Sequence, residues 1–217
     1  MDTLAHGLWA TAAAKANNRF APLKFRTKWF VFWGVLPDLF SFTPAVVWLL
    51  WQVMIEGVPF AEVPRPELLS PEVRMTFPVF RLSNALYHLS HSLIIFAGIF
   101  LLVWAIRRYW LKSRQAVTMS GSLLSAAGPC WEMTGWMLHI LIDIPTHTRR
   151  LYPTPFLWPL SDFTIDGISW GRPWFLALNY SSLLIVFLLL RLKSRKKQEG
   201  LLSGEVYTNK QLKQLDS

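Results

Sequence analysis

Histidines and aspartates stand at helical spacing in this chain. His6 follows Asp2 by four residues, and Asp143 follows His139 by four. Residues three or four apart share one face of a helix, so their imidazole nitrogens and carboxylate oxygens can converge on a cation. Imidazole and carboxylate ligands together suit zinc, and we expect one or two such ions. The pattern favours a metal site assembled from helices.

The expected ligands of the metal are five residues: His6, Asp38, His91, His139 and Asp143. An aspartate near the centre of a membrane helix costs about 2.5–3.5 kcal/mol on insertion scales, so Asp38 needs partners at that depth. A cation shared with histidines supplies them. We expect Asp143, Asp38 and Glu132 to be catalytic, the aspartates as ligand or general base and Glu132 as a supporting carboxylate. A Glu132 hydrogen-bonded to a neighbouring helix is an equal alternative.

Five further residues are candidates for supporting contacts or a second ion: Asp2, His88, His147, Asp162 and Asp166. Each also has an ordinary structural explanation. Asp2 suits the first turn of a helix, where a carboxylate favours the helix dipole. His88 could start a helix at the membrane interface, and His147 could cap one. Asp162 and Asp166 fall in a turn-rich stretch, where carboxylates are common. The sequence leaves both interpretations open.

The elements that must position these residues are membrane helices. Of the 217 residues, 53% are hydrophobic and 15% aromatic, with a mean hydropathy of +0.31, outside the range of ordinary soluble domains. Crossing a membrane takes about 20 apolar helical residues. Four runs meet that requirement: Trp29–Ile55, Ala85–Ile106, Val117–Asp143 and Trp174–Leu190. We expect an all-α integral membrane protein with about four spans, a shorter helix over Met1–Ala16, and a first span broken at Pro37.

The basic residues predict how the spans are oriented. Sixteen of the 22 Lys and Arg residues fall before the first span, between the second and third, or after the fourth. Positive charge favours the cytoplasmic side, so both termini are expected there, at an inner membrane. Residues 1–190 then form one membrane domain, with proline-rich, extended loops 56–84 and 144–173 facing outward. Residues 191–217 form a basic, then polar, cytosolic tail.

Charge and cysteine content exclude other classes of protein. The net charge of +9 comes from short clusters between apolar runs, which argues against nucleic acid as a partner. A single cysteine, Cys130, cannot form an intrachain disulfide or a cysteine-based zinc site. The start of the chain lacks the basic region of a signal peptide, so none is expected. Membrane lipids are the expected partners.

Four short segments occur in order along residues 1–185: Met1-Asp2-Thr3-Leu4-Ala5-His6-Gly7, Gly34-Val35-Leu36-Pro37-Asp38, Leu89-Ser90-His91-Ser92-Leu93 and Leu138-His139-Ile140-Leu141-Ile142-Asp143. Together they resemble the LexA-regulated (YdjM-like) membrane-bound metal-dependent hydrolases of bacteria and archaea. Residues 153–161 and 166–170 are similar to a Trp-Pro segment of that family. The sequence departs from the family at Ala5, where many members have Thr, and at Leu86-Tyr87, where a His-Arg pair is frequent.

The resemblance implies a helical membrane protein whose histidines and aspartates bind divalent metal. By looser similarity to zinc-dependent phospholipase C, it implies hydrolysis of a phosphoester. We therefore expect a membrane-embedded metal-dependent hydrolase that acts on a lipid or phosphoester substrate at the outer membrane face. The alternatives are a non-catalytic scaffold in which metal holds helices together, and a metal transporter, which would want ligands near the bilayer midplane and often two related halves.

Overall fold

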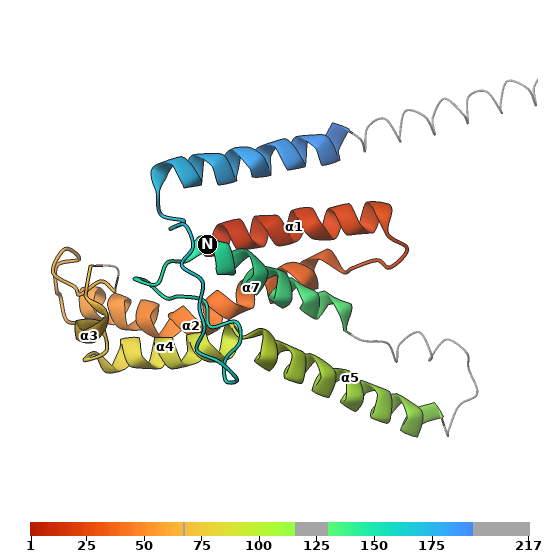
Figure 1. Ribbon diagram of the computed structural model, residues 1–217, viewed down its shortest axis with the longest axis horizontal. Coiled ribbons are helices and arrows are strands. Elements are labelled where there is room, and N and C mark those ends of the chain that lie inside the picture. Colours follow the sequence, from red (N-terminus) through yellow and green to blue (C-terminus); the bar gives the residue numbers. More distant parts are fainter. Residues whose placement is uncertain (67, 116–129, 193–217) are drawn as a thin grey trace, which may run out of the picture.

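The computed structural model describes residues 1–66, 68–115 and 130–192, and this part of the chain is helical (Figure 1). Its one departure from helix and loop is an isolated β-bridge between Thr148 and Leu151. The expected all-α fold is therefore confirmed for the described residues. The helices, in chain order, are α1 (Thr3–Phe20), α2 (Thr27–Met54), α3 (Pro71–Arg74), α4 (Pro78–Ser90), α5 (Leu93–Gln115), η1 (Trp131–Met133), α7 (Thr134–Thr146) and the helix Pro173–Leu192.

Three helices are long and apolar enough to cross a membrane: Thr27–Met54, Leu93–Trp110 and Pro173–Leu192. They correspond to the first, second and fourth expected spans. The third, Val117–Asp143, lies partly outside the described residues, so a count of four is not confirmed. Leu102 and Leu184 are 59% and 60% exposed, as side chains on helix faces that meet lipid would be. The molecule thus has the length and surface of a membrane protein.

The helices α1, α2 and α7 pack with their backbones unusually close. A Cβ atom on Gly34 of α2 would lie 2.8 Å from the Cβ of Ala10 in α1. A Cβ atom on Gly135 of α7 would lie 2.2 Å from the carbonyl oxygen of Phe30. Both distances are too short for any side chain, so glycine is required at these two positions. This close packing brings residues of α7 within reach of the backbone of α2.

Helix α2 is continuous through both of its prolines, so the expected break at Pro37 was wrong. A proline removes one hydrogen bond from the helix ladder, but the bonds on either side of it remain. The hydroxyl of Ser41 donates to the carbonyl oxygen of Pro37 at 2.8 Å. In addition, α2 packs against α1, α4 and α7. Within this continuous helix Asp38 is buried.

The second expected span contains the break instead, at His91 and Ser92 between α4 and α5. The hydroxyl of Ser92 accepts the backbone N–H groups of Ile94 and Ile95, each at 3.1 Å, and so caps α5. The indole N–H of Trp136 donates to the carbonyl oxygen of Ser90 at 2.5 Å. Backbone groups freed inside a membrane need such protein partners. The break is therefore stabilised by specific hydrogen bonds, and His91 lies in it.

The segments between the helices differ partly from expectation. Helix α4 begins at Pro78, inside the expected loop 56–84, because proline is well suited to the first turn of a helix.

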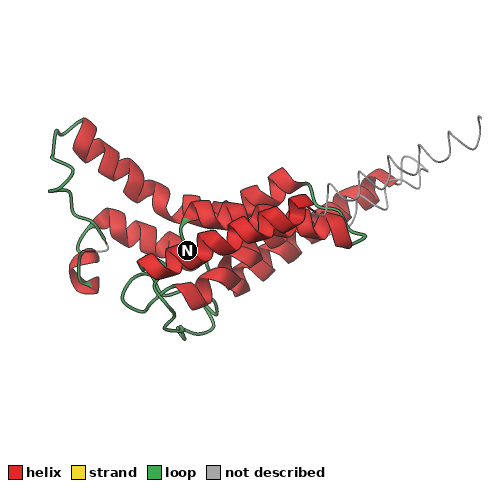
Figure 2. Cartoon of the chain, turned by 90° about the horizontal axis from the view of Figure 1, so that it is seen from above, coloured by secondary structure: helices red, strands yellow, loops and turns green. Residues whose placement is uncertain are grey.

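Figures 1 and 2 show an elongated body whose helices run mostly lengthwise. In Figure 1 the C-terminal ends of α1, α5 and the helix Pro173–Leu192 lie at the same end of the molecule. The segment 147–172 covers the middle of the bundle away from that end.

Candidate metal centre

Four buried side chains meet where α2, α7 and the break between α4 and α5 come together: Asp38, His91, His139 and Asp143. One possible ligand atom from each lies within 4.8 Å of the others. His91, His139 and Asp143 are at most 1% exposed, and Asp38 is 5% exposed. Charged and polar groups buried to this degree need partners or an ion. We call these four residues the inner group.

The separations within the inner group match those of a metal site. The Nε2 atom of His139 lies 3.1 Å from Nε2 of His91, 3.2 Å from Oδ2 of Asp143 and 3.5 Å from Oδ1 of Asp38. The Nε2 atom of His91 lies 3.4 Å from Oδ2 of Asp143 and 3.7 Å from Oδ1 of Asp38. Ligand atoms about 2.0–2.1 Å from a tetrahedral zinc ion lie about 3.4 Å from one another. Five of the six separations in the inner group are therefore close to this value, and the group could hold a metal ion.

Hydrogen bonds on the far side of each ring aim both imidazoles into the inner group. Nδ1 of His139 lies 2.8 Å from the carbonyl oxygen of Gly34. A carbonyl only accepts, so Nδ1 carries the proton, and in the neutral ring Nε2 presents a lone pair. This contact depends on the close approach of α7 to α2 at Gly34.

His91 is oriented by a chain of two serine hydroxyls. The hydroxyl of Ser41 donates to the carbonyl oxygen of Pro37, and its oxygen lies 2.6 Å from that of Ser90. The oxygen of Ser90 lies 2.8 Å from Nδ1 of His91. Because the chain ends on a carbonyl, the donors run from Nδ1–H through Ser90 to Ser41. Nε2 of His91 then also faces the group with a lone pair, an arrangement that a shared cation stabilises.

Asp143 has a second side. Its Oδ1 atom accepts from the α-amino group of Met1 and lies 2.9 Å from Nε2 of His6 and 3.3 Å from Nδ1 of His147. We call the Met1 amino group, His6 and His147 the outer set. The ring of His6 also stacks on that of His139, with centroids 3.6 Å apart. Burial lowers the pKa of His147 to about 4, so its ring is neutral at pH 7. Asp143 therefore contacts the inner group through Oδ2 and the outer set through Oδ1.

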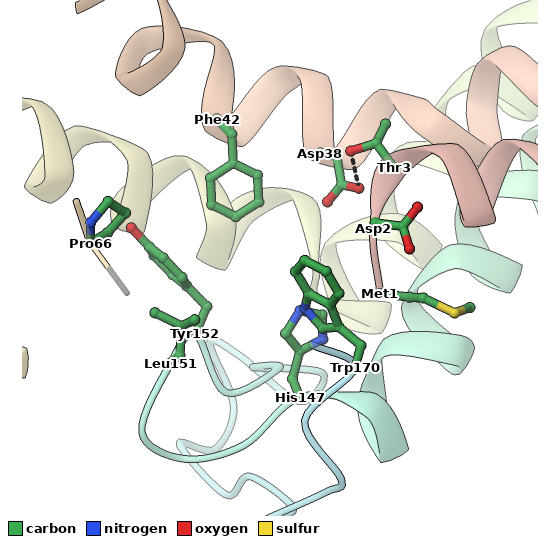
Figure 3. A pocket seen from close by; sticks show the side chains of 10 residues that line it. All are labelled: Met1, Asp2, Thr3, Asp38, Phe42, Pro66, His147, Leu151, Tyr152 and Trp170. Carbon is green, nitrogen blue, oxygen red and sulfur yellow. Dashed lines mark hydrogen bonds between the residues drawn. The ribbon is translucent and has the colours of Figure 1, made fainter. Parts of the chain in front are cut away.

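A cavity of about 270 Å³ lies beside the inner group (Figure 3). Of the four inner residues, Asp38 alone lines this cavity, and Thr3 donates to its Oδ2 atom at 2.8 Å. His147 and Trp170 lie across from Asp38, and Tyr152 lies farther along (Figure 3). The cavity gives a small polar group access to the carboxylate of Asp38, while Asp143 stays enclosed.

Glu132 does not join the inner group, so its expected role beside the metal is not supported by the geometry. It lies in η1, where Oε1 accepts from the backbone N–H of Arg26 at 3.3 Å. Seven residues separate it from His139, which is about 10 Å along a helix axis. The alternative interpretation, a carboxylate bonded to a neighbouring segment, describes Glu132 better.

The remaining candidates divide in the same way. Nδ1 of His88 lies 2.8 Å from the carbonyl oxygen of Asn84 in its own helix, outside the inner group. Asp166 accepts from the backbone N–H of Arg149 at 2.8 Å, and Asp162 is exposed; neither belongs to the inner group. Asp2 caps α1 by accepting from Ala5 at 2.9 Å, and it also lines the cavity. Of these five residues, His147 contacts Asp143 and Asp2 shares the cavity with Asp38.

Four supporting residues were not among the candidates from the sequence: Thr3, Gly34, Ser41 and Ser90. Thr3 contributes a hydroxyl to Asp38, Gly34 a carbonyl to His139, and the two serines the chain of hydroxyls to His91. Thr3, Gly34 and Ser90 stand within the short segments that contain His6, Asp38 and His91, which is the only hint that the sequence offered. No protein-family model, no curated protein and no solved structure matches this chain.

Proposed function

We propose that this protein is a membrane-embedded metal-dependent hydrolase. The observation that carries the proposal is the set of five separations, 3.1–3.7 Å, among His91, His139 and the two aspartates. Two imidazoles and two carboxylates form a donor set that zinc accepts readily. Their burial, and the bonds that orient each ring, are typical of ligands rather than of isolated polar residues.

The residues of the site divide the work between binding and proton transfer. A bound divalent ion would lower the pKa of a water molecule and polarise a phosphoryl or acyl oxygen. His91 and His139 would hold the ion through Nε2, and Asp143 would hold it through Oδ2. Asp38 is the carboxylate that a water molecule in the cavity can reach. We therefore assign Asp38 to proton acceptance, with Thr3 holding its second oxygen.

The surroundings of the site favour a lipid or lipid-linked phosphoester as substrate. Helices that could cross a membrane flank the inner group, so a substrate already held in the membrane reaches it more easily than a bulky soluble one. The resemblance to the YdjM-like hydrolases agrees with this class of reaction. We propose the inner membrane as location, with the cavity facing outward.

Metal analysis followed by turnover assays tests the proposal. The purified protein, loaded with Zn²⁺, should bind about one or two equivalents and hydrolyse a member of a panel of phosphodiesters and phospholipids. Asp38→Asn should keep the metal and lose turnover, whereas Asp162→Asn, a carboxylate outside the site, should change neither. Bound metal without any turnover would favour a scaffold, and release of the ion across a vesicle membrane would favour transport.

Cysteine labelling tests the proposed orientation. In a Cys130→Ser background, cysteines at Arg108 and Gly200 should react only after the membrane is permeabilised, and cysteines at Arg65 and Arg149 should react in intact cells. The common location of the ends of α1, α5 and the helix Pro173–Leu192 supports this arrangement (Figure 1). The reverse labelling pattern would place the cavity on the cytoplasmic side.

A further inference from the structure

A second cavity of about 370 Å³ is lined by none of the four inner-group residues but by several of their neighbours in the sequence. We call it the apolar groove. Its apolar walls are side chains of α2, α4 and α5: Trp33, Leu36, Phe40, Leu89, Ile95 and Ile99. Its floor includes Pro37 and Ser90. Each of these two directly adjoins an inner-group residue in the sequence, Asp38 and His91.

The polar atoms on the floor of the groove already have partners. The hydroxyl of Ser90 bonds to Ser41 and to Nδ1 of His91. The indole N–H of Trp136, which also lines the groove, donates to the carbonyl oxygen of Ser90. The rings of Trp33 and Trp136 are stacked, with an interplanar angle of 5°, and both line the groove. An occupant therefore gains nothing from polar groups and must itself be apolar.

The position of the groove specifies the kind of apolar occupant. Two of its walls, α2 and α5, are helices that could cross a membrane. Side chains at its rim are open to the surroundings: Phe40 is 47% exposed, Leu89 39% and Ile99 38%. At this depth the surrounding solvent is the hydrocarbon of the bilayer. A helix is about 10 Å across and could insert only side chains, whereas a lipid chain could lie along the groove.

We propose that the apolar groove binds one acyl chain of a membrane phospholipid. The chain would lie against Pro37 and Ser90, directly behind the residues that hold Asp38 and His91. Its volume is within the range of about 300–1,000 Å³ found for small-molecule sites. This lipid site goes beyond the hydrolase function and does not depend on it, because acyl-chain binding requires neither metal nor turnover.

Photolabelling tests the lipid site directly. The full-length protein is placed in phosphatidylcholine vesicles that contain a phosphatidylcholine with a diazirine in one acyl chain, and labelled peptides are mapped by mass spectrometry. We expect label on residues 33–40 and 95–99 at least fivefold above the rest of α5. Ile99→Trp, which fills the groove, should reduce that label at least fivefold. Leu102→Trp, at a position on the same helix that is 59% exposed and outside the groove, should not.

Two results would overturn the proposal. Label spread evenly over the faces of α5 would show ordinary bilayer contact without a site. A crosslink between two copies of the chain through residues 95–99 would show a protein partner in the groove. Helical content measured by circular dichroism checks that Ile99→Trp is folded, and the map of the unaltered protein decides the question even if that variant fails. Absence of hydrolase activity would leave the labelling result unaffected.

Discussion

The two oxygens of Asp143 face two environments that differ in kind. Oδ2 lies near Nε2 of His91 and Nε2 of His139, which carry a positive charge only when the rings are protonated, and near the carboxylate of Asp38. Oδ1 lies near His6, His147 and the amino group of Met1, which supplies a positive charge. The inner side therefore has no group with a fixed positive charge, so a bound cation would stabilise its two carboxylates. On the outer side, the positive charge of the Met1 amino group already offsets the negative charge of the Asp143 carboxylate.

This difference predicts an order of importance among residues that are all buried histidines or aspartates. On the inner side, His91, His139 and Asp143 should be required for metal binding, because each contributes one of about four ligands, whereas Asp38 should be required for turnover. Residues on the outer side should adjust the charge and position of Asp143. Groups that bond to Nδ1 of the two imidazoles should have a still smaller effect on metal binding, because they act only by orienting the rings.

The largest effect is expected on the inner side. His139→Ala and Asp143→Ala should each remove bound metal, because the loss of one ligand also leaves the others unpaired in a buried site. Elemental analysis of the purified variants measures this directly. Asp166→Ala removes the same type of side chain from an exposed turn and should keep the metal content of the parent. Unchanged metal in both inner variants would refute the site.

His88 in α4 and His91 just after its end should differ in their effect on activity, because only His91 belongs to the inner group. His91→Ala should lower metal-dependent turnover by more than the factor of about 10–100 that loss of a supporting partner costs. His88→Asn should cost little, because its ring bonds only to the carbonyl oxygen of Asn84 among the described contacts. Activity assays on correctly inserted protein compare the two. Equal damage would make both histidines ligands, and would require a second ion.

Substitutions on the outer side should have an intermediate effect. His6→Ala and His147→Ala should each keep at least one equivalent of metal and lower turnover about 10–100-fold, as loss of a supporting partner does. Metal stoichiometry and activity are measured on the same samples. A fall from two equivalents to one would turn the outer set into a second metal site. Loss of all metal would show that the residues near Oδ1 of Asp143 are as necessary for metal binding as those near Oδ2.

The smallest effect on metal binding is expected from Ser90, whose hydroxyl contacts Nδ1 of His91. Ser90→Ala should weaken metal affinity about tenfold, since the proton on Nδ1 loses its acceptor and the ring loses its orientation. Competition with a chelator measures the affinity. Ser83→Ala is the matched control, because Ser83 is equally buried in α4 but its hydroxyl has no hydrogen-bond partner in the described structure. Equal affinities in the two variants would remove Ser90 from the site.

Spacing within one helix was a good guide to the site. His139 and Asp143, four residues apart, do face the same point, and hydrophobic length located three helices that could cross a membrane. Both properties depend on neighbours along the chain. They could therefore be predicted without knowledge of tertiary structure.

The location of the helix break could not be predicted in this way. Pro37 has the stronger local effect on a helix, yet α2 continues through it. The break at His91 depends on Trp136 and on Phe156, whose carbonyl oxygen accepts from Leu93 at 2.9 Å. Those partners lie more than forty residues away in the sequence. The misplacement of Glu132 has a similar cause, because the helical periodicity is interrupted at η1.

The bond between Thr3 and Asp38 has a consequence for biosynthesis. His6 and Asp143 are separated by 137 residues, so α1 and α2 leave the ribosome long before α7 exists. During that interval Asp38 has none of its partners on α7, and a lone carboxylate is costly at membrane depth. The hydroxyl of Thr3, already synthesised, can donate to it at once. The contact that holds Asp38 in the complete site can therefore also give its carboxylate a hydrogen-bond donor before α7 has been synthesised.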